Sequence, residues 1–307
     1  MRLCRIGPAS SPRAAFYDEQ RIVPFADAAR TFGPSIAEPQ GDDLLAHLAS
    51  PVVRKLATWL DSQDYVPGQI ENAKVELLVP IPRPNKIFLL AGNYAEHIKE
   101  GGGVASERAD TFPYVFMKPA STTLNHPSNP VRIPKVSPGA IDWELELVVV
   151  IGKTCKDVTE AEALDYVAGY TIINDISNRK YRPNPGRKKR EKDSFFDWLH
   201  GKWHDSFCPC GPCIVSTDEI PDPQSLAMKL THNGQIRQNG NTSQMIFPVA
   251  ALVEFISAMV TLEPGDLIST GTPAGVGNTT GTYLKAGDVM HGTISGIGTL
   301  TTRMVDE

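Results

Sequence analysis

The chain has 307 residues, 41% of them hydrophobic, and carries a formal net charge of −5. This length suits one large domain or a small domain followed by a large one, and the acidic balance argues against a nucleic-acid or anionic-membrane partner. No apolar run approaches the ~20 residues of a membrane span, and residues 1–13 lack the apolar stretch of a secretory signal, so we expect a cytoplasmic protein. Five cysteines are too few, and odd in number, for a disulfide framework.

The first 80 residues show little sign of chemistry. We expect a strand over 1–7, a hairpin over 14–25, and a helix over 42–62 that is interrupted at Pro51. The proline-rich segment that follows, VPIPRP, is stiff and extended. We therefore predict a small N-terminal domain over 1–80 and a larger domain over 81–307.

The segment KIFLLAGNYAEHIKEGGG predicts a strand, a turn and a short helix that carries His97 and Glu100. Residues three apart share one helical face, so the carboxylate can hold the imidazole in a chosen tautomer. An ordinary surface ion pair is the alternative. The three glycines at 101–103 favour either a hinge for a lid over a ligand or a plain flexible loop.

An acidic strand is predicted over 141–152. Asp142, Glu144 and Glu146 alternate onto one face, and 147–151 is then apolar on both faces, as in a strand that enters a core. Ionised carboxylates about 7 Å apart at the edge of a core are costly unless a cation compensates them. Asp175, at the end of a second apolar strand, offers a third oxygen donor. The pattern indicates either a divalent-metal site or solvated acids on a half-exposed strand.

A helix is predicted over 157–169, with Thr159 as its cap and Glu162 completing a capping box. The chain then becomes basic and irregular from 179 to 197, which is typical of a solvated loop, and the role of its most basic part, 187–192, stays open.

The segment FFDWLHGKWHDSFCPCGPC allows two interpretations. Its cysteines are either small apolar fillers or ligands of a zinc ion, although paired Cys-x-x-Cys motifs are missing. The candidate zinc ligands are His200, His204, Cys208, Cys210 and Cys213. Lys202 lies among bulky aromatic residues and can present its ammonium group to an anion in a partly dry site.

The C-terminal third predicts a hairpin around Asn233 and Gly234, a helix over 247–260 and two closing strands over 287–305. The loop after the strand near 267 has exposed amides around Thr272 and Gly275 that either hold a carboxylate or form an ordinary turn. Because strands predominate, we expect a mostly β fold with some α structure, closed or rolled rather than doubly wound.

Several motifs occur in one order: GNYAEHIKE, DWELELVVVIG, NDISNR, GKWHDSFCPCGP, NGQIRQNGNTSQMIF, TLEPGDLISTGTPAGVG and YLKAGDV. In this the chain resembles the fumarylacetoacetate hydrolase family from about residue 86 to its end, and the acylpyruvase and hydratase-isomerase members in particular. The resemblance implies a mixed β-sandwich roll, a homodimer, and a Mg²⁺ or Mn²⁺ ion that binds a 2-oxo acid. It implies metal ligands at Glu144, Glu146 and Asp175, catalytic residues at His97, Glu100 and Lys202, and substrate contacts at Arg179, Arg182, Thr272 and Gly275.

The function that we expect from the resemblance is metal-dependent hydrolysis of a carbon-carbon bond in a 2,4-dioxo acid, with water activated by His97 and Glu100. Decarboxylation of an oxaloacetate-type acid, or hydration or isomerisation of a 2-oxo-enoate, is the alternative at the same site. A protein with structural zinc and no catalysis is the alternative of another class. Where many family members have a glutamine that contacts substrate, this chain has Arg182, whose charge would favour a substrate with a further carboxylate.

Overall fold

The computed structural model describes residues 1–106 and 108–307. Its largest sheet has the strand order β4-β3-β2-β1-β14-β12-β11-β17-β6-β7, with β5 beside β1 and β8 beside β14. In that order the strands are β4 (Ile70–Glu71), β3 (Arg21–Pro24), β2 (Arg13–Tyr17), β1 (Arg2–Ile6), β14 (Cys208–Ser216), β12 (Val167–Asn174), β11 (Leu145–Ile151), β17 (Leu267–Ser269), β6 (Ile87–Ala91), β7 (Tyr114–Met117), β5 (Leu77–Leu78) and β8 (Leu124–Asn125).

A second sheet and a short ribbon complete the strands. The second sheet runs in the order β16 (Gln235–Asn241), β15 (Ala227–His232), β18 (Val289–Ile294), β19 (Gly298–Asp306) and β9 (Val131–Ile133). The ribbon pairs β10 (Ile141–Asp142) with β13 (Ser177–Asn178).

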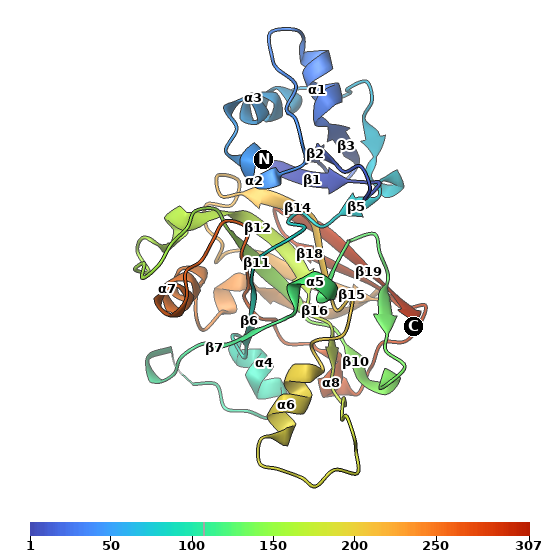
Figure 1. The fold of residues 1–307 in the computed structure, drawn as a ribbon, viewed down its shortest axis with the longest axis vertical. Helices are drawn as coiled ribbons and strands as arrows, with labels where there is room; N and C mark the ends of the chain where they lie inside the picture. The colour runs from blue at the N-terminus through green and yellow to red at the C-terminus, as the bar shows by residue number, and fades with distance from the viewer. Residues whose placement is uncertain (107) are drawn as a thin grey trace.

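The helices are short and lie around these sheets (Figure 1). The α-helices are α1 (Phe25–Phe32), α2 (Leu44–Leu48), α3 (Pro51–Leu60), α4 (Ala95–Glu100), α5 (Ala120–Thr123), α6 (Asp193–His200), α7 (Val249–Met259) and α8 (Gly277–Thr280). The 3₁₀ helices are η1 (Asn72–Lys74), η2 (Arg108–Asp110), η3 (Pro138–Ala140), η4 (Ala163–Tyr166) and η5 (Thr242–Gln244). Within the described residues, no helix is both long and apolar enough to cross a membrane.

Strand β11 runs between two apolar cores. Leu147 and Val149 belong to one core, whereas Val148 and Val150 belong to the other. Because successive side chains of a strand point to opposite faces, burial on both sides explains the continuous apolar run of this segment.

The second sheet packs on one face of the large one. Leu230 of β15 and Met290 of β18 share an apolar core with Leu147 and Val149. Two sheets packed face to face, with short helices around them, confirm the predicted mostly β fold with some α structure.

Residues 1–80 form most of the upper, blue lobe in Figure 1. Strand β1 of this lobe pairs antiparallel with β14, so the large sheet is continuous across the predicted boundary. Leu3 and Phe16 also share an apolar core with Val148. The division at residue 80 stays a prediction, and the contacts show that the lobe is joined to the rest by both a sheet and a core.

The interruption predicted at Pro51 is confirmed. The expected helix over 42–62 is divided into α2 and α3, and the Ser50 hydroxyl accepts a hydrogen bond from the Val53 N–H at 3.3 Å. Pro51 lies in the first turn of α3, where its missing N–H costs nothing.

The predicted C-terminal hairpin and helix are also confirmed. Asn233 and Gly234 connect β15 to β16 with φ angles of +48° and +79°, as a type I′ turn requires. Helix α7 covers most of the predicted span.

The helix predicted over 157–169 is wrong. The 3₁₀ helix η4 forms there instead and β12 already begins at Val167, although the Thr159 hydroxyl does donate to the Glu162 carboxylate at 2.7 Å. The strands on either side, β11 and β12, are antiparallel neighbours, and such a pair needs no helical crossover to connect it.

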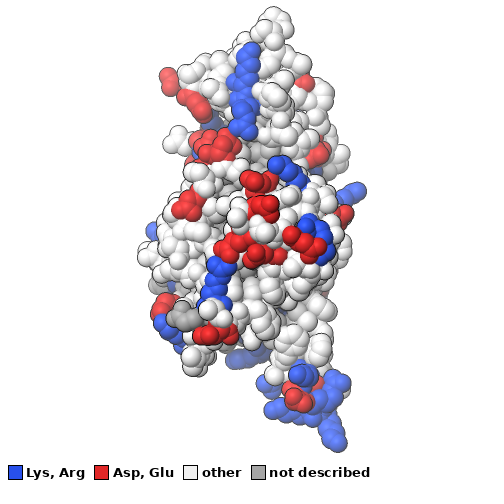
Figure 2. Space-filling view, turned by 90° about the vertical axis from the view of Figure 1, so that its left-hand side faces the viewer, with Lys and Arg blue, Asp and Glu red and all other residues white. Residues whose placement is uncertain are grey.

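The basic stretch extends from the lower end of the molecule, between β13 and α6 (Figure 1). Lys and Arg side chains gather at this end in Figure 2. Arg187 is tied to α6 through Asp193 at 3.1 Å and Asp197 at 2.6 Å, whereas Lys188, Lys189 and Arg190 are exposed. Arg190 also lies 3.1 Å from Asp193, so the predicted solvated loop is present and is anchored to the start of α6.

Candidate metal centre and active site

Three carboxylates converge where β11 begins and β12 ends. Leu145 lies opposite Asn174 in this antiparallel pair, which brings Glu144 and Glu146 beside Asp175. Each of the three acids offers an oxygen within 4.8 Å of the others, and their residues are 5%, 1% and 0% exposed. Solvated acids on a half-exposed strand are therefore excluded, and the cluster fits a hard, oxygen-preferring cation such as Mg²⁺ or Mn²⁺.

Asp142 does not join this cluster, although the simple alternation groups it with Glu144 and Glu146. The chain leaves strand geometry between β10 and β11, and this turns the Asp142 carboxylate away. It accepts hydrogen bonds from the N–H groups of Gly277 at 2.6 Å and Asn278 at 3.1 Å. Asp142 therefore anchors the first turn of α8.

One buried and one partly buried cation compensate most of the negative charge. Lys202 contacts Glu144 at 2.7 Å and Asp175 at 2.6 Å, and Arg179 contacts Glu144 at 2.5 Å. Arg179 also binds Asp142 at 2.8 Å. Burial raises the pKa of the Glu144 carboxyl, but the charges of Lys202 and Arg179 outweigh this and hold it well below its usual value.

Glu146 has no cationic partner in the described part of the chain. It accepts hydrogen bonds from the Ser269 hydroxyl and from the Gly271 N–H, the latter at 3.1 Å. Burial and the nearby charges of Asp175 and Glu144 raise the pKa of the Glu146 carboxyl well above its usual value. An added cation between these acids would remove this repulsion, which supports a metal ion at this position.

His97 and Glu100 form the predicted pair on α4. His97 Nδ1 lies 2.7 Å from Glu100 Oε1, and Glu100 Oε2 accepts a hydrogen bond from the Gly275 N–H at 2.8 Å. Because the carboxylate is held at both oxygens, it fixes the imidazole ring and leaves Nε2 available. The Gly275 amide, expected to hold a substrate carboxylate, here holds the protein's own Glu100.

The acidic cluster and the His97–Glu100 pair both contribute side chains to one small cavity of about 160 Å³. Its polar lining consists of His97, Glu144, Glu146, Arg179, Lys202 and Thr272. Segments far apart in the sequence are thus brought to one space that holds a candidate base, a candidate metal site and two cations.

The match to a known protein family covers the part of the chain that carries the predicted resemblance. Residues 86–305 fit the family model described as Fumarylacetoacetate (FAA) hydrolase C-terminal. The chain belongs to the fumarylacetoacetate hydrolase family. The predicted resemblance is therefore confirmed.

Two relatives in this family illustrate the activities that accompany the fold. A 2,4-didehydro-3-deoxy-L-rhamnonate hydrolase of Sphingomonas sp. (strain SKA58) is 46% identical over 224 residues, which cover 72% of this chain and 73% of the relative. A mitochondrial oxaloacetate tautomerase of Xenopus laevis is 40% identical over 248 residues, 80% of this chain and 72% of the relative.

Solved structures of the family match along the whole chain. A fumarylacetoacetate hydrolase from Exiguobacterium antarcticum has a TM-score of 0.78 and 29% identity, with 100% of both chains covered. A maleylpyruvate hydrolase from Sphingobium sp. SYK-6, solved with manganese(II) and pyruvate, has a TM-score of 0.73 and 29% identity, covering 100% of this chain and 99% of that chain.

One expected substrate residue lies outside the lining of the candidate site. Arg182 is exposed and is not among the residues that line the cavity. It follows Arg179 by three residues, but β13 has ended and the chain has entered the basic loop. Its contact with substrate stays a prediction.

Lys118 is the residue that sequence reasoning missed. It follows β7, and its buried ammonium group bonds to Asp175, to the Phe207 carbonyl at 2.6 Å and to the Ile176 carbonyl at 3.1 Å. A lysine directly after an apolar strand and before a proline was the available signal. The aromatic setting predicted for Lys202 is confirmed, because the ammonium lies 5.4 Å from the Phe116 ring centre and 5.7 Å from the Trp198 ring centre.

The zinc ligands of the alternative interpretation do not come together. Among the described residues the acidic cluster is the one group placed to hold a metal ion. Cys208 and Cys210 lie in one apolar core and Cys213 in the other, because β14 alternates its side chains. Burial raises the pKa of the Cys208 thiol to about 12, which disfavours the thiolate that zinc requires.

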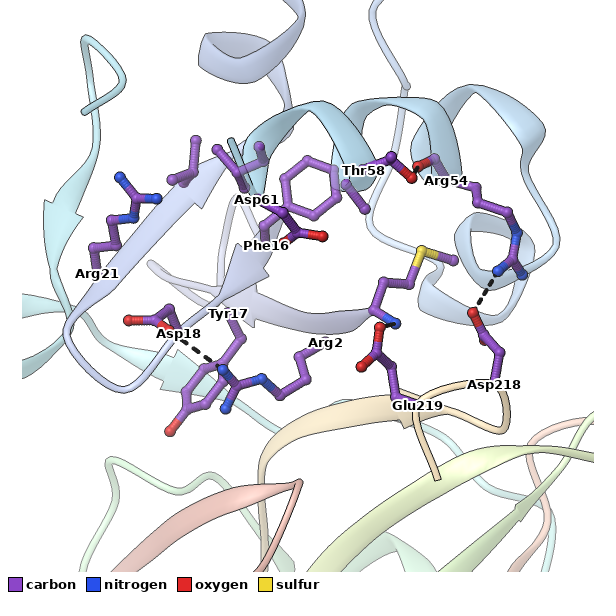
Figure 3. A pocket seen from close by; sticks show the side chains of 14 residues that line it. Arg2, Phe16, Tyr17, Asp18, Arg21, Arg54, Thr58, Asp61, Asp218 and Glu219 are labelled. Atoms are coloured by element: carbon purple, nitrogen blue, oxygen red, sulfur yellow. Dashed lines mark hydrogen bonds and ion pairs between the residues drawn. The ribbon is translucent and has the colours of Figure 1, made fainter. Parts of the chain in front are cut away.

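A larger cavity, of about 500 Å³, lies near the N-terminus in the upper lobe (Figure 3). Its charged side chains largely pair with one another: Arg2 lies 3.3 Å from Asp18, and Arg54 lies 2.6 Å from Asp218. Size alone would favour this cavity, but the convergent carboxylates and the His97–Glu100 pair lie at the smaller one.

Proposed function

We propose that this protein hydrolyses a carbon-carbon bond in a 2,4-dioxo acid of the acylpyruvate type, with Mg²⁺ or Mn²⁺ held by Glu144, Glu146 and Asp175. The observation that carries the proposal is the cavity lined both by the half-buried His97 and by two of the three clustered acids, Glu144 and Glu146. When bound, the ion would act as a Lewis acid toward the 2-oxo acid end of the substrate. The relative solved with manganese and pyruvate supports this choice.

Each side chain around the cavity has a separate role in this reaction. His97 Nε2 takes a proton from the attacking water, while Glu100, held by Gly275, keeps the ring in the required tautomer. Lys202 and Arg179 supply positive charge for the oxyanion that develops at the distal carbonyl. Thr272 lies on the wall of the cavity, and its main-chain N–H would bind the substrate carboxylate, because its hydroxyl already donates to the Leu145 carbonyl at 2.9 Å.

Product analysis with Mn²⁺-loaded protein tests the reaction. We expect acylpyruvate to give pyruvate and a second acid, and His97→Gln to lower turnover by about 10²–10⁴-fold while Mn²⁺ affinity stays the same. A His97→Gln protein that retains turnover, or that loses Mn²⁺ binding, would contradict the assigned role.

Tautomerisation of a 2-oxo acid is the second candidate, because a relative that covers 80% of the chain is named an oxaloacetate tautomerase. Decarboxylation and isomerisation of such acids use the same end of the substrate. The products separate these reactions: hydrolysis gives two acids, decarboxylation gives CO₂, and tautomerisation or isomerisation conserves the mass of the substrate.

A further inference from the structure

A second cavity adjoins the candidate site. It measures about 320 Å³ and shares Leu90, Ala91 and Gly92 with the smaller polar cavity. These three residues form the end of β6 and the turn before α4. The two spaces therefore lie on either side of a common wall, directly beside the helix that carries His97.

The lining of this second cavity is mostly apolar, although Ser106, Thr111 and Tyr114 contribute hydroxyl groups. Ile98, Phe112, Ile246 and Phe247 contribute to it, and none of the described lining residues is charged. Its buried amide, Asn93, is already satisfied, because Nδ2 donates to the carbonyls of Phe247 at 3.1 Å and Thr270 at 2.9 Å, and Oδ1 accepts from the Phe247 N–H at 2.8 Å. A charged ligand group would therefore find no oppositely charged partner among the described residues of this lining.

The position of the cavity matches the geometry of the reaction. In a 2,4-dioxo acid the carbonyl that water attacks also bears the acyl tail, so the tail must leave the polar cavity next to His97. Ile98 is the next residue on α4 and lines the apolar cavity. Gly92, with φ of +65°, lies in the shared wall, and the Ile98 side chain packs 3.5 Å from where a Cβ of Gly92 would lie.

We propose that the apolar cavity binds the acyl tail, so that the substrate is an acylpyruvate with an uncharged aliphatic or aromatic tail. This inference rests on the proposed function. It differs from the expectation, based on Arg182, of a substrate with a further carboxylate, and Arg182 lines neither cavity. A volume of this size is at the lower end of that found in ligand-binding pockets.

A substrate series tests the assignment. We expect kcat/KM for pyruvate release to rise roughly fourfold per methylene from acetylpyruvate to hexanoylpyruvate, as burial of each CH₂ predicts. The ω-carboxylate counterpart of hexanoylpyruvate should be a poorer substrate than hexanoylpyruvate itself, because its charge would be buried without a partner.

A matched pair of variants locates the effect. Phe112 lines the cavity and Met259 lies outside its lining, and both are 59% exposed. Phe112→Ala should lower the ratio of hexanoylpyruvate to acetylpyruvate kcat/KM roughly fivefold to tenfold, whereas Met259→Ala should leave that ratio unchanged.

The outcomes separate the two proposals. Three results would overturn the tail cavity and leave the proposed reaction standing. They are release of pyruvate from acetylpyruvate with no rise in kcat/KM along the series, a preference for the diacid, and an unchanged ratio of hexanoylpyruvate to acetylpyruvate kcat/KM in Phe112→Ala. Failure of every member of the series to give pyruvate overturns the reaction, and the tail cavity with it.

Discussion

At the scale of single residues, Lys118 shows how the acidic cluster is kept in place. Its side chain is 0% exposed, and its ammonium group is shared by Asp175 and two backbone carbonyls. An ammonium has three N–H donors, so these acceptors satisfy it completely. Lys118 therefore holds one Asp175 oxygen while Lys202 contacts the other at 2.6 Å.

Removal of this ammonium should be costly. Lys118→Met leaves Asp175 and two carbonyls without their buried partner, so we expect the free energy of unfolding in urea to fall by about 3–5 kcal/mol. Lys99→Met removes an exposed ion pair with Glu96 and should cost at most about 1 kcal/mol. Equal, small losses in the two variants would show that Lys118 is not an essential partner of Asp175.

The residues of the site were easier to predict than their supports. Glu144, Glu146 and Asp175 could be identified because carboxylates beside an apolar strand are conspicuous, and the structure brings them together. Lys118 was harder to identify, because its partners are carbonyls and a carboxylate from 57 to 89 positions away, and its place between an apolar strand and a proline does not indicate them. Asp142 was misgrouped for a similar reason, since the break in strand geometry depends on tertiary contacts.

At the scale of elements, the loop before α8 supports the pair on α4. The Gly275 N–H binds Glu100, and the Gly275 carbonyl accepts from the Trp143 indole N–H at 3.1 Å. Gly275 has φ of +106°, and a Cβ there would lie 2.0 Å from the Arg237 carbonyl oxygen. Only glycine fits this position, so the sequence of the loop fixes the orientation of His97 indirectly.

Substitution of this glycine should misplace the dyad without disturbing the acids. We expect Gly275→Ala to lower turnover about 10²-fold, the effect of a displacement near 1 Å, while Mn²⁺ affinity is retained. Gly281 also has a positive φ, +67°, but has open space around it. Gly281→Ala should therefore cost about 1–2 kcal/mol of stability and leave turnover unchanged. Identical turnover in the two variants would contradict this role of Gly275.

Elements with strong local signals were predictable, and those set by topology were not. The Asn233–Gly234 turn forms because few other pairs tolerate two positive φ angles. The helix predicted over 157–169 fails although its capping contact forms, because the strands it connects are adjacent and antiparallel. The order of the strands depends on contacts between distant segments, and the local pattern of one sequence does not predict it.

At the scale of the whole molecule, the N-terminal lobe completes the large sheet. β1 covers the edge of β14, all of whose residues are buried, and the lobe contributes Leu3 and Phe16 to a core that also contains Val148. A chain of residues 81–307 alone would expose this edge and part of that core. Exposed strand edges of this kind promote aggregation.

We therefore expect one unfolding transition for the full chain by circular dichroism in urea, and aggregation of the 81–307 fragment in size-exclusion chromatography. A monodisperse 81–307 fragment with the Mn²⁺ affinity of the full chain would show instead that the lobe is dispensable. The homodimer implied by the family resemblance stays a prediction, which the same chromatography of the full chain tests.

The central claim is that Glu144, Glu146 and Asp175 together bind one hard divalent ion. Titration calorimetry of Mn²⁺ into the metal-free protein tests this claim most directly. The variants are Glu144→Gln, Glu146→Gln and Asp175→Asn. The control is Asp157→Asn, because Asp157 is an exposed acid outside the cluster. The account predicts one ion per chain for the wild type and Asp157→Asn, and loss of binding in each cluster variant. Unchanged Mn²⁺ binding in the three cluster variants would contradict it.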